Sequence, residues 1–188
     1  MASPAEKYPV RRTGELHKGR VSIPGARYFV TFVTHHRKPW LGQHPCADSV
    51  IAVLRAWHDE HDGAILAATV MPDHVHVLFE LGQKLTAGRC VGRWKSDVRR
   101  AISFSHDWLR DFYEHRLLPD EPAEDHSLYI FLNPYRARLV SAGKPWPWWW
   151  APAPRRFRFS EMLDVDGGPP REWLDWPDER FTKLAIGE

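Results

Sequence analysis

Cysteine is scarce in this chain. Only Cys46 and Cys90 occur, and no CxxC pair is present. A zinc knuckle or a disulfide framework needs closely spaced cysteines, so neither is predicted. Disulfides are rare in reducing compartments, and a sequence with two distant cysteines suits such a compartment best. We therefore expect a cytoplasmic protein.

Long apolar runs are also missing. No run approaches the roughly 18 to 20 residues that span a bilayer, and the first residues lack the apolar centre of a signal peptide. We therefore expect a soluble protein without a membrane partner. With 188 residues, 43% of them hydrophobic, the chain can bury the core of one domain. We place this domain at residues 21–140, between a basic arm at residues 1–20 and a Trp- and Pro-rich extension at residues 141–188.

A strong net charge is absent overall, but the charges are unevenly distributed. The formal net charge is +2, whereas residues 159–188 hold 8 acids and 3 bases, so this segment carries −5 and the remainder carries +7. A basic body suits a polyanion such as nucleic acid, although a charge of this size is also ordinary for a soluble protein. The acidic segment could shield the basic surface from non-specific DNA.

Hydrophobic periodicity predicts strands first and helices between them. The predicted strands are residues 27–34, 64–71 and 74–81. The predicted helices begin at Asp48 or Ser49, at Leu85, and at Asp125 or Ser127. Residues 108–117 mix aromatic, His and Arg side chains, which fits either a packed strand or a nucleic-acid contact. Pro134 is expected to end or kink the last helix.

His74 and His76 are the first candidates for chemistry. They open the third predicted strand, after a Pro72-Asp73 turn that limits slippage of the hairpin register. Because strand side chains alternate between faces, both imidazoles point to the same side. Two imidazoles on one face make half of a metal site. Two surface histidines on an edge strand are the alternative, and the commoner case.

Tyr129 and Asn133 are the second candidates, because they lie one turn apart on one face of the last predicted helix. A hard cation, Mg²⁺ or Mn²⁺, held by His74, His76 and the amide oxygen of Asn133 would keep open positions and could polarise a phosphodiester. Tyr129 could then act as a nucleophile if a base or metal activates its phenol, whose free pKa is about 10. The alternative is a buried tyrosine beside an asparagine that caps the helix.

Basic side chains supply candidate DNA contacts, with a solvated basic face as the alternative. The candidates are Arg89, Arg93, Lys95, Arg99, Arg100, His115, Arg116 and Arg136. The tryptophans of residues 146–150 precede three arginines, as in proteins that stack single-stranded bases. A strap that covers an open sheet edge explains the same tryptophans equally well.

The order of these motifs resembles the REP-associated tyrosine transposases, relatives of the single-tyrosine transposases in the HUH endonuclease superfamily. The similarity rests on the segments PDHVH (residues 72–76) and YIFLNP (residues 129–134), and it spans residues 23–140. The chain departs from the family at Tyr135, where a small β-branched residue is common, and at Arg138, where glycine is common.

The resemblance implies an α+β, ferredoxin-like fold: an antiparallel sheet with helices on one face, and the tyrosine helix over the sheet edge. It implies metal-assisted attack by Tyr129 on a single-stranded DNA phosphate, which leaves a 5′-phosphotyrosine and a free 3′-hydroxyl. His74 and His76 carry over as metal ligands, with Asn133 as the third. The DNA partner would be a palindromic repeat folded as a hairpin.

The sequence leaves the oligomeric state and the activity with alternatives. The protein could be a monomer or a homodimer. It could be a domesticated relative that binds hairpin DNA without cutting it. A metal-binding structural protein without nucleic acid is the weakest reading, because structural zinc sites usually close with four His or Cys ligands, and no such set is evident.

Overall fold

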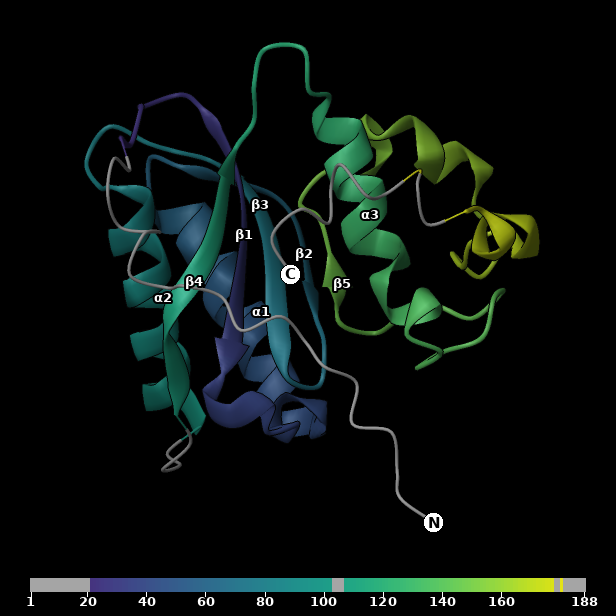
Figure 1. Cartoon of the computed structure of the whole chain (residues 1–188), viewed down its shortest axis with the longest axis horizontal. Helices are drawn as coiled ribbons and strands as arrows, with labels where there is room; N and C mark the ends of the chain where they lie inside the picture. Colours follow the sequence, from purple (N-terminus) through teal and green to yellow (C-terminus); the bar gives the residue numbers. More distant parts are fainter. Residues whose placement is uncertain (1–20, 103–106, 178–179, 181–188) are drawn as a thin grey trace.

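The computed structural model describes residues 21–102, 107–177 and 180, and its centre is one antiparallel sheet (Figure 1). The predicted basic arm, residues 1–20, lies outside the described residues. The strands are β1 (Arg27–Thr34), β2 (Ala64–Val70), β3 (His74–Glu80), β4 (Trp108–Arg116) and β5 (Trp149–Trp150). The helices are α1 (His44–Glu60), α2 (Ala87–Ile102) and α3 (Ala123–Arg136).

The strands lie in the order β4-β1-β3-β2-β5, and each neighbouring pair is antiparallel. Apart from two short 3-10 helices between β1 and α1, the first elements follow the chain as β1-α1-β2-β3-α2-β4. This arrangement confirms the predicted α+β, ferredoxin-like class. The segment that had two readings, residues 108–117, forms strand β4 for nearly its whole length.

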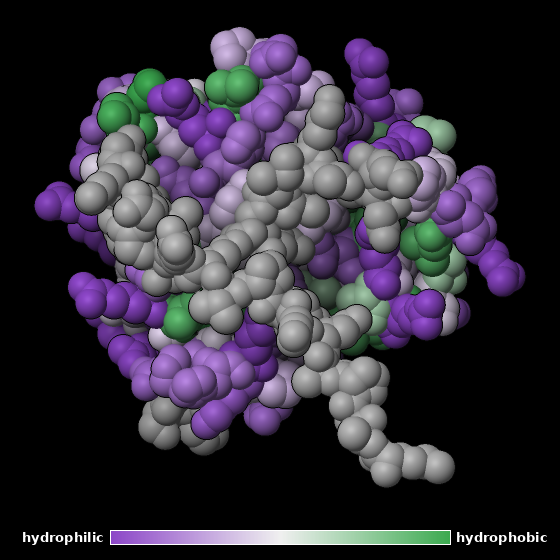
Figure 2. Space-filling model, viewed as in Figure 1, coloured by the Kyte–Doolittle hydropathy of each residue, from purple (hydrophilic) through white to green (hydrophobic). Residues whose placement is uncertain are grey.

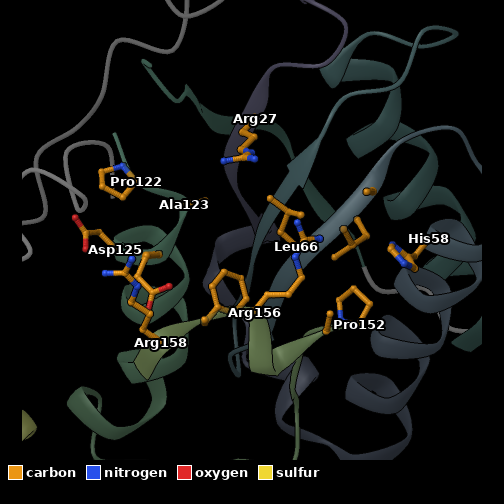
Figure 3. Close-up of a pocket in the computed structure, with 14 residues that line it drawn as sticks. Arg27, His58, Leu66, Pro122, Ala123, Asp125, Pro152, Arg156 and Arg158 are labelled. Atoms are coloured by element: carbon orange, nitrogen blue, oxygen red, sulfur yellow. The ribbon is translucent and has the colours of Figure 1, made fainter. Parts of the chain in front are cut away.

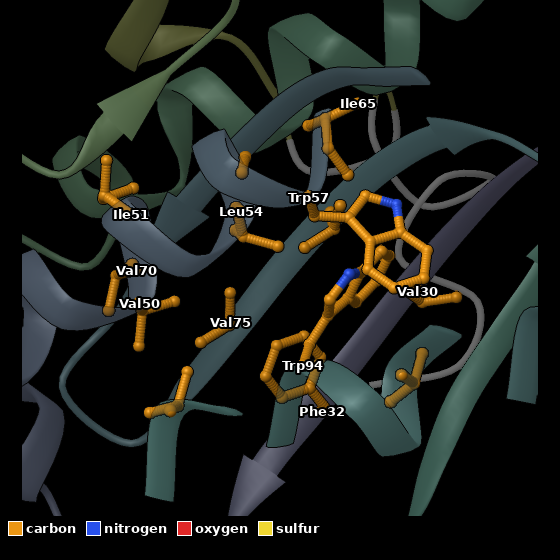
Figure 4. Close-up of a cluster of buried hydrophobic side chains, with 14 of the residues drawn as sticks. Val30, Phe32, Val50, Ile51, Leu54, Trp57, Ile65, Val70, Val75 and Trp94 are labelled. Carbon is orange, nitrogen blue, oxygen red and sulfur yellow. The ribbon is translucent and has the colours of Figure 1, made fainter. Parts of the chain in front are cut away.

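Helices α1 and α2 cover one face of the sheet (Figure 4). Val30 and Phe32 of β1 meet Leu54 of α1 and Trp94 of α2, and all four are fully buried or nearly so. Complete burial of such side chains contributes about 1.5–3 kcal/mol each. The predicted apolar stripe of α2 is therefore confirmed, and it directs the arginines of this helix toward solvent.

Helix α3 lies against the opposite face, where it packs with Phe29 of β1 and Leu78 of β3. It contacts β2 and β3, and β2 is flanked on its outer side only by the two-residue strand β5, so the helix lies over the part of the sheet next to this edge. Phe159 and Trp173 belong to the same hydrophobic cluster and are 4% and 3% exposed. Part of the acidic segment is therefore core rather than a solvated tail.

The Trp-rich segment covers the β2 edge of the sheet. Strand β5 pairs with Ala68 and Thr69 of β2. The indole of Trp146 donates to the carbonyl of Val70 at 3.1 Å, and the indole of Trp148 donates to Asp48 at 3.1 Å. These bonds confirm the interpretation of the extension as a strap over the sheet edge, because both indoles form hydrogen bonds with other parts of the same chain.

Two helices begin earlier than predicted. Helix α1 begins at His44, with Pro45 in its first turn, because proline is favoured there and its missing N–H costs nothing. Helix α3 begins at Ala123 and continues through Pro134 to Arg136. Proline removes one hydrogen bond from the helix ladder, and packing of both helix ends outweighs that loss.

Arg138 ends α3 in a strained conformation, with φ +58°. This is the left-handed region in which glycine commonly terminates a helix, and it explains physically why glycine suits position 138. We expect Arg138→Gly to raise the free energy of unfolding by about 1 kcal/mol. Thermal unfolding measures this change. Ala137→Gly is the matched control, because Ala137 has φ −74° and glycine should destabilise it; equal losses in both variants would contradict the strain argument.

The visible surface is mostly hydrophilic, and its hydrophobic residues form separate spots (Figure 2). Within the described ranges, no helix is long and apolar enough to cross a bilayer.

Candidate functional site

His74 and His76 meet on the α3 face of the sheet, as their alternation predicts. Their Nε2 atoms are 3.0 Å apart. The His76 side chain is fully buried, and 13% of the His74 side chain is exposed. The site is therefore a buried pair of ring nitrogens with access to solvent on the His74 side.

Each histidine is held by its other nitrogen. Nδ1 of His74 lies 2.6 Å from a carboxylate oxygen of Asp73, and Nδ1 of His76 lies 2.8 Å from the hydroxyl of Thr31. Arg37 donates to the second oxygen of Asp73 at 3.0 Å. Partners of this kind orient imidazole ligands and leave Nε2 as the coordinating atom. The register of β1 against β3 places Thr31 directly beside His76.

The electrostatics of the pair favour neutral imidazole on the buried side. Burial, followed by the charge of His74, holds the pKa of His76 well below its usual range. Burial alone would raise the pKa of Asp73, but the hydrogen bond from His74 and the positive charges of His74 and Arg37 lower it. An ionised Asp73 accepting from His74 beside a neutral His76 is a suitable arrangement for metal ligation.

Tyr129 and Asn133 reach the histidines from α3 of the same chain. The rings of Tyr129 and His76 have centroids 5.8 Å apart, and the Asn133 side chain is hydrogen-bonded to His76. Phe29 packs against both rings, with its own ring centroid 5.6 Å from that of His76 and 5.9 Å from that of Tyr129. The four candidates from two distant segments therefore converge, and the helix needs no exchange with a second chain to bring Tyr129 to the site. The phenol ring itself is buried, at 4% exposed.

These donors fit a divalent cation. Two nitrogen lone pairs 3.0 Å apart repel unless a proton or a cation lies between them, and ligands about 2.1 Å from one ion at right angles are about 3.0 Å apart. Amide oxygen suits Mg²⁺ or Mn²⁺, whereas imidazole nitrogen suits later transition metals, so the donor set fits a divalent cation without selecting one. Among the described residues no group of three His, Cys, Asp or Glu side chains is placed to hold a metal, so that part of the chain offers no closed zinc site.

Some of the predicted basic residues of α2 are exposed, and others form ion pairs or hydrogen bonds within the protein. Arg89 and Arg93 are exposed. Arg99 pairs with Asp107, and Arg100 pairs with Asp97. Lys95 turns inward, where its ammonium donates to the backbone carbonyls of residues 109–111 at 2.8 to 3.3 Å. These bonds connect α2 to β4. Burial also lowers the pKa of Lys95 to about 8.

The remaining basic candidates lie near the two ends of α3. His115 bonds to Glu121 at 2.8 Å, and its ring stacks on His126. Arg116 is exposed, and Arg136 is half-buried one turn beyond Asn133. His115 therefore ties strand β4 to the start of α3, where its stacking partner His126 precedes Tyr129 by three residues.

A basic groove of about 790 Å³ lies at the other end of the sheet (Figure 3). Arg156 and Arg158 of the extension, Arg27 of β1 and His58 of α1 line it, together with the acidic Glu124 and Asp125 of α3. Arg27 pairs with Glu80, the end of β3 far from His74. The groove is therefore separate from the histidine pair.

Sequence reasoning missed three partners of the site: Thr31, Arg37 and Asp73. Asp73 precedes His74 in the sequence, but we interpreted it only as a residue of the turn and not as a partner of the imidazole. Thr31 lies in a strand whose pairing partner cannot be read from local pattern. Arg37 carried no signal beyond its place in a basic loop.

Comparisons with known proteins bear on the fold and the family of this chain. The family model described as "Transposase IS200 like" matches residues 22–118, a range that contains both histidines and ends before Tyr129. A REP-associated tyrosine transposase of Haemophilus influenzae is 24% identical over 142 residues, which cover 66% of this chain and 78% of that protein. A solved structure of a REP-associated tyrosine transposase bound to a REP hairpin has a TM-score of 0.64 at 22% identity, covering 90% of this chain and 94% of that one. The structural similarity establishes the fold, and because the family model spans more than half of the residues, this chain belongs to the IS200-like transposase family.

Proposed function

We propose that this protein is a metal-dependent, single-stranded DNA endonuclease and strand transferase that acts on hairpin-forming repeats. The observation that carries the proposal is the meeting of Tyr129 and Asn133 with the His74–His76 pair within one chain. The family of the chain supports it, as does the similar solved structure, which holds a REP hairpin. Cleavage would proceed through a 5′-phosphotyrosine intermediate.

The proposed reaction is a transesterification. The Tyr129 oxygen forms a bond to the scissile phosphorus, the bond from phosphorus to the 3′ oxygen breaks, and the DNA keeps a free 3′-hydroxyl. The phenol loses a proton and the 3′ oxygen gains one, so the number of P–O ester bonds does not change. The free-energy change of the step is therefore small and the step is reversible, as strand transfer requires. Because the phenol is 4% exposed, it must become more accessible when DNA binds.

His74, His76 and Asn133 would hold the divalent cation in this proposal. The cation would polarise the phosphate and offset its developing charge. Asp73 and Thr31 keep the imidazoles oriented through their Nδ1 atoms. Phe29 of β1 packs edge-on against the Tyr129 ring and helps to hold it beside His76.

The direct test uses the protein with Mn²⁺ or Mg²⁺ and labelled hairpin oligonucleotides taken from repeats around its own gene. The expected result is a covalent adduct that survives denaturation and disappears with excess chelator. A stable hairpin complex without any adduct would favour the alternative, a hairpin-binding protein that does not cut. The burial of Tyr129 is the observation that keeps this alternative in view.

The oriented carboxylate of Asp73 yields a separate prediction. We expect Asp73→Asn to raise the Mn²⁺ concentration needed for half-maximal cleavage by about 10- to 100-fold, as loss of a ligand-orienting partner does in other metal sites. The backbone carbonyl of Asp73, which accepts from Thr34, is unchanged, so the turn should persist. Asp59→Asn on the exposed side of α1 is the control. An unchanged metal requirement in Asp73→Asn would contradict the orienting role.

A further inference from the structure

Residues 35–38, His-His-Arg-Lys, form a basic loop at the end of β1. All four residues are exposed. The loop begins where Val33 pairs with His74, so it lies at the histidine end of the sheet. Its backbone is tied to β4 through the bond from His35 N–H to the carbonyl of Asp107 at 2.7 Å. Arg37 extends to Asp73, the residue beside His74. The loop therefore adjoins the candidate site.

The loop is held in a strained conformation. His36 and Arg37 have φ of +55° and +50°, a region that costs side-chain-bearing residues about 1 kcal/mol or more each. The buried side chain of Thr34, which is 1% exposed, offsets part of this strain by holding the loop in place. Its hydroxyl lies 2.8 Å from the carbonyl oxygen of Lys38 and 3.0 Å from that of Asp73. Glycine would adopt these angles without strain but would present no side chain. The fold therefore keeps two large polar side chains at positions where they are costly.

The side chains of the loop match the chemistry of a single DNA strand. The rings of His35 and His36 lie with centroids 3.9 Å apart and planes tilted by 44°, so each exposed ring presents its own flat face, on which a base can stack. Within the described ranges, no carboxylate pairs with the exposed Lys38, and Arg37 keeps half of its side chain exposed beside its bond to Asp73. A single strand carries both phosphate charges and flat bases, and this loop offers two rings followed by two cations to meet them.

We propose that the basic loop, residues 35–38, holds the DNA strand immediately beside the scissile phosphate. Lys38 and Arg37 contact phosphates, and the exposed ring of His36 stacks on a flanking base. The location of the scissile phosphate rests on the proposed function. The groove of Arg27, Arg156 and Arg158 is less suited to this role, because it lies at the far end of the sheet and shares its lining with Glu124 and Asp125.

The test measures DNA affinity rather than cleavage, so it can be judged separately from the proposed chemistry. All variants are made in the Tyr129→Phe background, and fluorescence anisotropy follows binding of a hairpin with and without a single-stranded flank over a range of NaCl concentrations. With the flank, Lys38→Gln should lower the slope of log K against log salt by about 0.7, the value of one single-strand phosphate contact. Without the flank, the slope should stay as in the parent protein.

His36→Gly separates binding from structure. It relieves a left-handed φ, so thermal stability should stay equal or rise, whereas affinity for the flanked hairpin should fall about 5-fold or more if a base stacks there. Lys84→Gln is the charge-matched control, since Lys84 is exposed in the loop after the opposite end of β3. Unchanged affinity and slope in both loop variants, or equal losses in Lys84→Gln, would overturn the proposal. Wild-type protein that forms adducts while the loop variants bind normally would overturn the loop assignment and leave the proposed function standing.

Discussion

Tyr129→Phe should abolish the covalent DNA adduct, with a fall in cleavage rate on the order of 10³-fold or more, because it removes the only atom that can form the new bond to phosphorus in the proposed reaction. Hairpin binding should change little, since the ring and its packing against Phe29 and His76 remain. Denaturing gels of labelled hairpin measure the adduct, and anisotropy measures binding.

Tyr135→Phe is the matched control for this prediction. Tyr135 lies on the same helix, is also buried, and donates its hydroxyl proton to the carbonyl of Lys144 at 2.8 Å. Its loss should cost about 1 kcal/mol of stability and leave adduct formation intact. Adducts of undiminished yield in Tyr129→Phe would assign the nucleophile to another residue.

Replacing either histidine by alanine should remove cleavage and the response to metal together. We expect His74→Ala and His76→Ala to lower the rate more than about 100-fold, since loss of a ligand exceeds the effect of losing a ligand-orienting partner. Metal binding also has a readout apart from activity. Mn²⁺ should raise the melting temperature of the wild-type protein, because an ion bound by the native state alone stabilises it by RT ln(1 + [L]/Kd).

The two histidine variants should lose this thermal shift, whereas His44→Ala on the exposed start of α1 should keep it. Melting without metal identifies any variant that merely fails to fold, which is a concern for the fully buried His76. Cleavage that continues at full rate in excess chelator would show that the pair does not act through a metal.

Helix α3 shows which structural features a local sequence pattern can predict and which it cannot. The spacing of Tyr129 and Asn133 predicted that their side chains share a face, because 3.6 residues per turn is a property of any helix. The same pattern could not predict that Pro134 stays inside the helix, since that depends on packing at both of its ends. Likewise, the pattern at residues 146–150 fitted both a DNA surface and a strap, and only the pairing of β5 with β2 decided between them.

The sequence by itself determined the strand alternation that puts His74 and His76 on one face, the helix that carries Tyr129 and Asn133, and the motif order that places the chain among the transposases. These features depend on neighbours a few residues apart. Tertiary structure alone decided that α3 packs on the histidine face, that Thr31 and Arg37 support the site, and that the basic loop adjoins it. Those contacts join residues at least 36 positions apart. Burial and strand register select the partners, and the local sequence period contains no information about either.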